Sequence, residues 1–219
     1  MWWLGAPLVA LAGKAIYDAT KGRHTTRPVS GRTTLERNLE RLGKELEASQ
    51  GRKFAVLGQP GAGKSTLLRR LTHDRITPLP VVGIHTDATD WASDPACNLL
   101  GRFEDDVYVD VPGYDTVSHP ASTLKLGFPF HAFDNILFVV NGKLRSADLD
   151  MFDRARFSNP SLFIARSFAE SLSDQEIEDV RKDLRNGFNS GNVPLLFFSN
   201  RANTGIEELA AVLTGLGRN

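Results

Sequence analysis

A glycine-rich segment that follows a short apolar run has the residue types and spacing needed to hold phosphate. Residues 58–65, Gly-Gln-Pro-Gly-Ala-Gly-Lys-Ser, match the pattern G-x-x-x-x-G-K-[ST]. Glycines allow the backbone N–H groups to turn toward a polyphosphate, and the N-terminus of the next helix adds partial positive charge. The pattern predicts a nucleotide-binding loop. Its predicted contacts are Gly58, Gly61, Ala62, Gly63, Lys64, Ser65 and Thr66.

A second motif supplies the metal side of such a site. The segment from Asp110 to Gly113 reads D-x-x-G and follows a short β-rich run. Asp110 at a strand end can hold Mg²⁺ through a water molecule, Ser65 can ligate it directly, and the N–H of Gly113 can contact a γ-phosphate. Lys64 should reach the β- and γ-phosphates. The two motifs together predict a magnesium-dependent nucleoside triphosphate site.

From about Lys53 to Gly217, the chain resembles the Ras-like and dynamin-like P-loop GTPases, most closely the immunity-related GTPase group and its bacterial relatives. Val111 stands where an ATPase of the D-E type has its glutamate, which argues against that class. The resemblance implies GTP, GDP and Mg²⁺ as ligands, and a switch-loop threonine over the metal. Thr86 is the preferred candidate and Thr89 the next. The implied catalytic residues are Lys64, Thr86 and Gly113, and the implied metal residues are Ser65, Thr86 and Asp110.

Two departures from the Ras-like pattern predict slow hydrolysis. Tyr114 follows D-x-x-G where Ras-like enzymes have a glutamine that orients the attacking water, and a phenol has no amide to do so. Pro60 stands where many small GTPases have glycine, and its ring crowds the space near the γ-phosphate. We therefore expect turnover to depend on the backbone, on a second copy of the chain or on an activating protein.

The resemblance also implies where the base would lie. After the fifth strand, Ser167, Phe168 and Glu170 occupy the positions of the T-K-x-D motif, so that Phe168 would stack on a purine and Glu170 would accept from the guanine edge. After the last strand, Ser199 and Asn200 match the closing S-A-K or S-N element. Because the base motif is altered, two alternatives stay open: an ATPase with relaxed base choice, and a pseudo-GTPase that binds nucleotide without useful hydrolysis.

Apolar runs alternate with helix-like segments along the rest of the chain, as in parallel α/β proteins. We predict a three-layer P-loop NTPase fold of the Ras-like type, with a mostly parallel six-stranded sheet and helices on both faces. The predicted strands are 54–57, 81–82, 107–109, 136–140, 162–164 and 193–198. The predicted helices that alternate with them include 65–71, 174–188 and 206–216.

The N-terminal part differs in composition from the rest. Residues 1–20 are mostly apolar, 21–33 read as a linker, 34–50 as an amphipathic helix and 51–219 as the nucleotide-binding domain. The first segment is too short and too interrupted to span a bilayer, which takes about 20 apolar residues. It is predicted either to lie in a membrane interface, with Trp2 and Trp3 at headgroup depth, or to form a helix packed on the domain.

Composition limits the partners and the compartment. The 219 residues include 26 Lys and Arg against 26 Asp and Glu, and a net charge of zero provides no long-range field for nucleic acid. The single cysteine, Cys97, indicates a reducing compartment. We therefore expect a cytoplasmic protein, at most peripheral on the cytoplasmic face of a membrane, with nucleotide as its ligand and no nucleic-acid partner.

Overall fold

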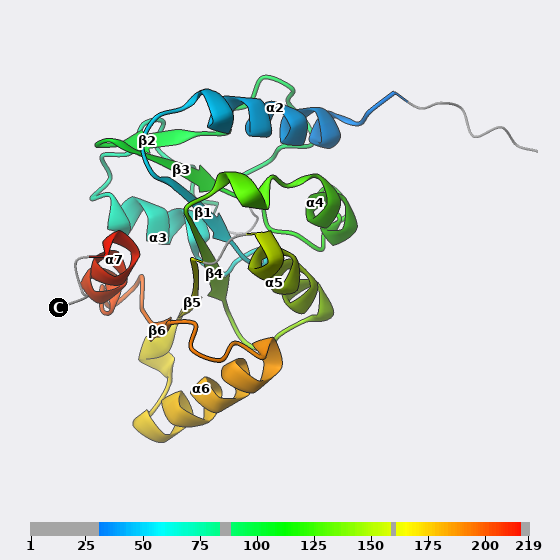
Figure 1. The fold of residues 1–219 in the computed structure, drawn as a ribbon. Helices are drawn as coiled ribbons and strands as arrows, with labels where there is room; N and C mark the ends of the chain where they lie inside the picture. Colours follow the sequence, from blue (N-terminus) through cyan, green and yellow to red (C-terminus); the bar gives the residue numbers. More distant parts are fainter. Residues whose placement is uncertain (1–30, 84–88, 159–160, 216–219) are drawn as a thin grey trace, which may run out of the picture. The chain divides into compact units, whose positions relative to one another are not determined.

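The computed structural model describes residues 31–83, 89–158 and 161–215. Within them, six strands form one sheet in the order β2-β3-β1-β4-β5-β6, in which β2 is antiparallel to β3 and the other neighbours are parallel (Figure 1). The strands are β1 (Lys53–Leu57), β2 (Gly101–Phe103), β3 (Asp106–Asp110), β4 (Asn135–Val140), β5 (Leu162–Arg166) and β6 (Leu195–Phe197). The predicted six-stranded, mostly parallel sheet is confirmed.

Helices cover both faces of this sheet. Neighbouring residues of β1 face opposite ways: Ala55 and Leu57 pack with helices α2, α4, α5 and α6, and Phe54 and Val56 pack with α3 and α7. Apolar residues on both faces explain why the strands read as continuous apolar runs. The helices are α2 (Thr34–Ala48), α3 (Lys64–Leu71), α4 (Ala121–Gly127), α5 (Ser146–Ser158), α6 (Asp174–Phe188) and α7 (Ile206–Thr214). Short 3₁₀ turns, η1 (Phe130–Ala132) and η2 (Ala169–Ser171), complete the elements.

The second predicted strand was wrong. Val81 and Val82 lie outside the sheet and are exposed, and their place is taken by β2, which forms a tight hairpin with β3. Proline explains the difference, because Pro78 and Pro80 in the same segment lack the N–H that a strand ladder uses. The segment instead makes a single antiparallel bridge from Thr77 to β2.

Helix α2 packs on the domain through an apolar stripe. It begins with a capping box, in which the Thr33 hydroxyl accepts from the Glu36 N–H and the Glu36 carboxylate accepts from the Thr33 N–H. Its four stripe residues are at most 4% exposed, so this face is part of the core and is not available to a partner. They are Leu35, Leu39, Leu42 and Leu46.

The predicted apolar segment 1–20 and most of the predicted linker lie outside the described residues. In the part of the chain that is described, no helix has the length and apolar character needed to cross a bilayer.

Candidate functional site

The predicted phosphate loop joins β1 to α3 at the carboxyl end of the sheet. Two of its glycines cannot be replaced by other residues without displacement of their neighbours. A Cβ on Gly58 would lie 2.2 Å from the carbonyl oxygen of Val139 in β4, and Gly63 has a φ of 91°. Ala62 is fully buried beneath the turn. The loop is therefore fixed against β4, with its backbone curved ahead of the α3 N-terminus, as a phosphate cradle requires.

Lys64, the first residue of α3, bends back across this loop. Its side chain is buried, and the Nζ donates to the carbonyl oxygen of Gln59 at 3.1 Å. A buried ammonium next to inward-curving backbone N–H groups creates a positive concavity. This is the position from which the predicted contact with the β- and γ-phosphates can be made.

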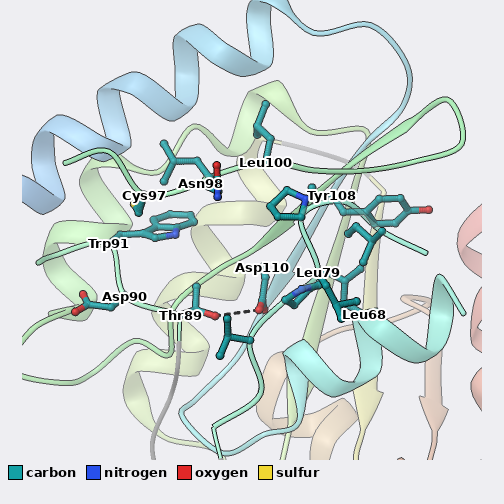
Figure 2. Close-up of a pocket in the computed structure, with 16 residues that line it drawn as sticks. Leu68, Leu79, Thr89, Asp90, Trp91, Cys97, Asn98, Leu100, Tyr108 and Asp110 are labelled. Atoms are coloured by element: carbon teal, nitrogen blue, oxygen red, sulfur yellow. Dashed lines mark hydrogen bonds between the residues drawn. The ribbon is translucent and has the colours of Figure 1, made fainter. Parts of the chain in front are cut away.

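Three oxygen-bearing side chains meet beside the loop. The Asp110 carboxylate, at the end of β3, accepts hydrogen bonds from the Ser65 hydroxyl at 2.6 Å and the Thr89 hydroxyl at 3.0 Å. Figure 2 shows Thr89 pointing toward Asp110 from the segment that precedes Trp91. Thr86, the preferred switch candidate, lies outside the described residues, whereas Thr89, the second candidate, lies at the metal side.

The chemistry of this cluster fits magnesium. Two hydroxyls and one carboxylate are hard oxygen donors, and Mg²⁺ is usually held in proteins by one or two carboxylates together with water and substrate phosphates. Ser65 and Asp110 were predicted as metal residues from the motifs, and the structure brings them together. We name Ser65, Thr89 and Asp110 the Asp110 cluster.

The D-x-x-G segment follows β3 directly into the site. The Val111 N–H donates to the Val56 carbonyl at 3.2 Å, which carries the strand pairing past Asp110, and Gly113 is buried. The next side chain, Tyr114, is fully buried and donates from its hydroxyl to Asp148 in α5 at 2.7 Å. Burial, with a smaller effect from the Asp148 charge, raises the pKa of Tyr114 well above 10, so the hydroxyl stays protonated. Held in this way, Tyr114 does not occupy the position of a water-orienting side chain.

The predicted base-side residues come together at the ends of β5 and β6. The Ala169 N–H donates to the Phe198 carbonyl at 3.1 Å, which joins the two strand ends. A hydrogen bond from the Ser199 hydroxyl is the main cause of the lowered pKa of Glu170, so this exposed carboxylate is ionised at neutral pH. Phe168 has a φ of 57° and is 41% exposed. An ionised acceptor two residues along the chain from an exposed aromatic ring provides the two group types that can recognise a purine.

The Asn200 side chain makes a contact that was not predicted. Its Nδ2 donates to the carbonyl oxygen of Gly63 at 3.1 Å, so the side chain joins the last loop to the phosphate loop. Ser167, predicted beside the base, is buried, and both its N–H and its hydroxyl donate to the Val140 carbonyl. In this structure both side chains support the backbone around the site.

The loop after Thr89 is fastened to α2. Asn38 is 1% exposed, and its Nδ2 donates to the carbonyl oxygens of Trp91 at 2.8 Å and Asp94 at 2.9 Å. One turn along the helix, Arg41 donates to the carbonyl of Cys97 at 2.6 Å. These contacts were not predicted from the sequence, although an asparagine within a leucine stripe is a signal of a buried polar contact.

The loop after D-x-x-G reaches the same place. The Trp91 N–H donates to the Nε2 of His119 at 3.1 Å, and the His119 N–H donates to the Thr116 hydroxyl at 3.0 Å. Trp91 is therefore bonded to both α2 and the loop that follows Gly113. Through Trp91, hydrogen bonds connect α2 with both the loop after Thr89 and the loop after D-x-x-G.

A cavity of about 330 Å³ opens next to the Asp110 cluster. Figure 2 shows Leu68 of α3, Leu79, Trp91 and Tyr108 around it, with Thr89 and Asp110 also in its wall. Its lining combines polar side chains, Thr89 and Asp110, with apolar ones such as Leu68 and Trp91.

A family model for GTPases described as 50S ribosome-binding GTPases matches residues 53–167. The chain belongs to this GTPase family. The match runs from β1, through the phosphate loop and D-x-x-G, to the residue after β5, and so contains the geometry described above. Membership supports GTP binding and hydrolysis as the general chemistry of the domain.

Solved structures with the same fold include a bacterial selenocysteine-specific elongation factor, at 17% identity and a TM-score of 0.58, with 76% of this chain and 28% of that chain covered. Era in complex with MgGDPNP and nucleotides of 16S ribosomal RNA has 17% identity and a TM-score of 0.58, with 76% of this chain and 57% of that chain covered. A probable GTP-binding protein, EngB, has 14% identity and a TM-score of 0.54, with 76% of this chain and 98% of that chain covered. At these identities the likeness establishes the fold.

The chain spans 28% of the elongation factor and 57% of Era, so it corresponds to a part of each. No curated protein matches the sequence. The P-loop GTPase prediction is confirmed, and the closer resemblance to immunity-related GTPases stays a prediction.

The Asp110 cluster makes Thr89 testable as a metal-side residue. We expect Thr89→Ala to raise the Mg²⁺ concentration for half-maximal GTP binding by about tenfold or more, because a hydrogen bond to a charged group contributes about 1.5–3 kcal/mol. Titration of GTP binding against Mg²⁺ measures this change. Thr123→Ala on α4 is the control, and equal Mg²⁺ dependence in the two variants would exclude Thr89 from the metal side.

Proposed function

We propose that this protein binds GTP and GDP with Mg²⁺ and hydrolyses GTP slowly, as a molecular switch. The observation that carries the proposal is the Asp110 cluster beside the phosphate loop, where Ser65 and Thr89 converge on one carboxylate from two different segments. A phosphate cradle alone would support binding only. A hydroxyl from the switch-side loop at the same carboxylate also supports a response to the γ-phosphate.

The proposed reaction is in-line attack of water on the γ-phosphorus. The bond from the water oxygen to phosphorus forms as the bond to the bridging oxygen of GDP breaks, giving GDP and inorganic phosphate. Lys64 and the loop N–H groups take up the developing charge, and the Gly113 N–H would contact the γ-phosphate. Ser65, Thr89 and Asp110 would hold Mg²⁺, which supplies further positive charge when bound. The roles predicted for Thr86, which lies outside the described residues, stay a prediction, and a metal-side role is proposed for Thr89.

The proposed slow rate follows from Tyr114. Its hydroxyl is engaged by Asp148 inside the protein, so the residue after D-x-x-G does not orient water in this structure. Turnover then relies on backbone groups, or on a group supplied by a second copy or an activating protein. An arginine from a partner is worth about 10³–10⁵ in rate in other GTPases, which is sufficient to convert a slow enzyme into a regulated one.

A molecular switch must also transmit its nucleotide state to another part of the protein, and the contacts of Trp91 support a route for this. Trp91 is bonded to Asn38 of α2 and to His119 of the loop after D-x-x-G. If either loop moves when the γ-phosphate is lost, these bonds must lengthen or α2 must follow. Nucleotide state would then be transmitted to α2.

Single-turnover hydrolysis tests the enzymatic proposal against a pseudo-GTPase. We expect bound GTP to be converted to GDP over minutes to hours, near the intrinsic rates of about 10⁻⁴–10⁻² s⁻¹ known for unassisted GTPases. The reaction is followed by chromatography of the nucleotide at low and high protein concentration. GTP that persists unchanged for many hours at both concentrations would favour the pseudo-GTPase.

Base choice is tested at Glu170. We expect the wild-type protein to bind GTP more tightly than ATP, and Glu170→Ala to weaken GTP binding by about tenfold or more without changing ATP binding, because bonds to a charged acceptor are lost. Glu178→Ala, on the exposed side of α6, is the matched control. Equal affinities of the wild-type protein for GTP and ATP would instead support the ATPase alternative.

We propose a cytoplasmic location, with residues 1–20 as a peripheral contact to the cytoplasmic face of a membrane. The support is compositional: two tryptophans and an apolar run precede a group of basic residues that an anionic leaflet would attract. That group comprises Lys21, Arg23, Arg27 and Arg32.

Flotation of the full chain with anionic liposomes tests this proposal. We expect the full chain to float and a chain lacking residues 1–20 to remain at the bottom, because the apolar contact is lost. Identical behaviour of the two would exclude the membrane contact. Flotation repeated with neutral liposomes separates the contribution of the basic residues.

The proposed partners are nucleotide and either a second copy or an activating protein. The matched family is described as ribosome-binding, and one matched Era structure holds ribosomal RNA. Neither partner is transferred to this chain, which corresponds to part of Era and has 26 basic and 26 acidic residues. We therefore keep the proposal that nucleic acid is not a partner.

A further inference from the structure

Three segments of the protein meet at a buried carboxylate outside the Asp110 cluster. Asp148 lies in the first turn of α5 and is 3% exposed. It accepts from the Tyr114 hydroxyl at 2.7 Å, from the Gln59 Nε2 at 3.1 Å and from the Arg145 N–H at 2.8 Å. The donors belong to the segment after D-x-x-G, to the phosphate loop and to the turn that begins α5.

A carboxylate this deeply buried is stabilised by each group that donates a hydrogen bond to it. Removing a charged group from water costs several kcal/mol unless hydrogen bonds compensate, and the three donors here are neutral groups. The loss of any one leaves a buried charge less well compensated. The Gln59 amide is constrained as well, because its Oε1 is buried with no hydrogen-bond partner among the described residues. The amide orients toward Asp148 although this leaves its own oxygen unsatisfied.

The two side-chain donors to Asp148 lie in, or directly after, the two sequence motifs of the nucleotide site. Gln59 lies in the phosphate loop, one residue after Gly58, and Tyr114 directly follows Gly113. In the proposed function, the phosphate loop surrounds the β- and γ-phosphates and the Gly113 N–H contacts the γ-phosphate. Asp148 therefore joins two segments that the proposed function places at the phosphates, one through Gln59 and the other through Tyr114.

We propose that Asp148 is a positioning residue for GTP hydrolysis. Through Gln59 and Tyr114, it holds the phosphate loop and the D-x-x-G segment at the spacing that the transition state requires. The proposal rests on the proposed GTPase function. It also assigns a role to Tyr114: its ring and hydroxyl anchor the backbone of Gly113, in place of the water-orienting role that a glutamine has in Ras-like enzymes.

The test compares substitutions at the contact with a matched change on the same helix. Tyr114→Phe removes one donor and keeps the aromatic ring, and Asp148→Asn keeps the size of the side chain but replaces one acceptor by a donor. Asp150→Asn is the control, because Asp150 is exposed and pairs with Lys125. Thermal unfolding of each variant shows whether it folds.

We expect single-turnover GTP hydrolysis to fall about 10- to 100-fold in Tyr114→Phe and Asp148→Asn, since misplacement of about 1 Å can cost 10²-fold. GDP affinity should change by less than about threefold, because the binding groups themselves remain. The control should match the wild type. Rates within about twofold of the wild type in a folded Tyr114→Phe protein would overturn the proposal, even if its unfolding temperature is lower.

A second measurement is independent of hydrolysis, so that failure of the GTPase proposal can be told apart from failure of this one. Amide hydrogen exchange is followed in the GDP complex for residues 58–62 and 111–115. Tyr114→Phe should accelerate exchange in the phosphate loop, on the far side of Asp148, as well as around its own position. Exchange in residues 58–62 equal to that of the wild type and of Asp150→Asn would overturn the role of Asp148.

Discussion

The Asp110 carboxylate stands at the end of a parallel strand, and its two hydrogen bonds determine how the site is assembled. The Ser65 hydroxyl comes from the first turn of α3, and the Thr89 hydroxyl from the segment that leads to β2. One acceptor thus brings together the phosphate loop and the switch-side loop. Because β3 pairs directly with β1, the Asp110 carboxylate lies next to the phosphate loop that follows β1. The metal side and the phosphate side of the site are therefore neighbours.

Around this cluster, hydrogen bonds join the loops to helices α2 and α5. Asn38 of α2 holds the backbone of Trp91, and Asp148 of α5 holds Gln59 and Tyr114. Both are buried polar side chains that several donors or acceptors must satisfy, so a shift in one loop changes contacts elsewhere. Such a network restrains the loops and connects their positions to the helices on one face of the sheet.

Much of this protein was predictable from patterns in contiguous residues. The phosphate loop, D-x-x-G and the apolar strands each depend on a short stretch, and the fold around them is as predicted. The strand predicted at Val81 and Val82 was wrong because neighbouring prolines remove N–H donors, and β2 was missed because it is only a three-residue strand. Glu170 and Ser199 were both predicted for the base side from the same kind of local motif, and in the structure Ser199 lowers the pKa of Glu170.

By itself, the sequence determined that a phosphate loop, an aspartate-ended strand and an amphipathic helix exist, because each depends on the local order of residue types. Only the tertiary structure decided that Thr89 reaches Asp110, that Asn200 contacts the phosphate loop, and that Tyr114 turns inward to Asp148. Each of those contacts joins residues that are far apart in the sequence and belong to different segments of the fold. The physical reason is that a hydrogen bond depends on distance and direction between two groups, and the packing of the helices on the sheet sets both.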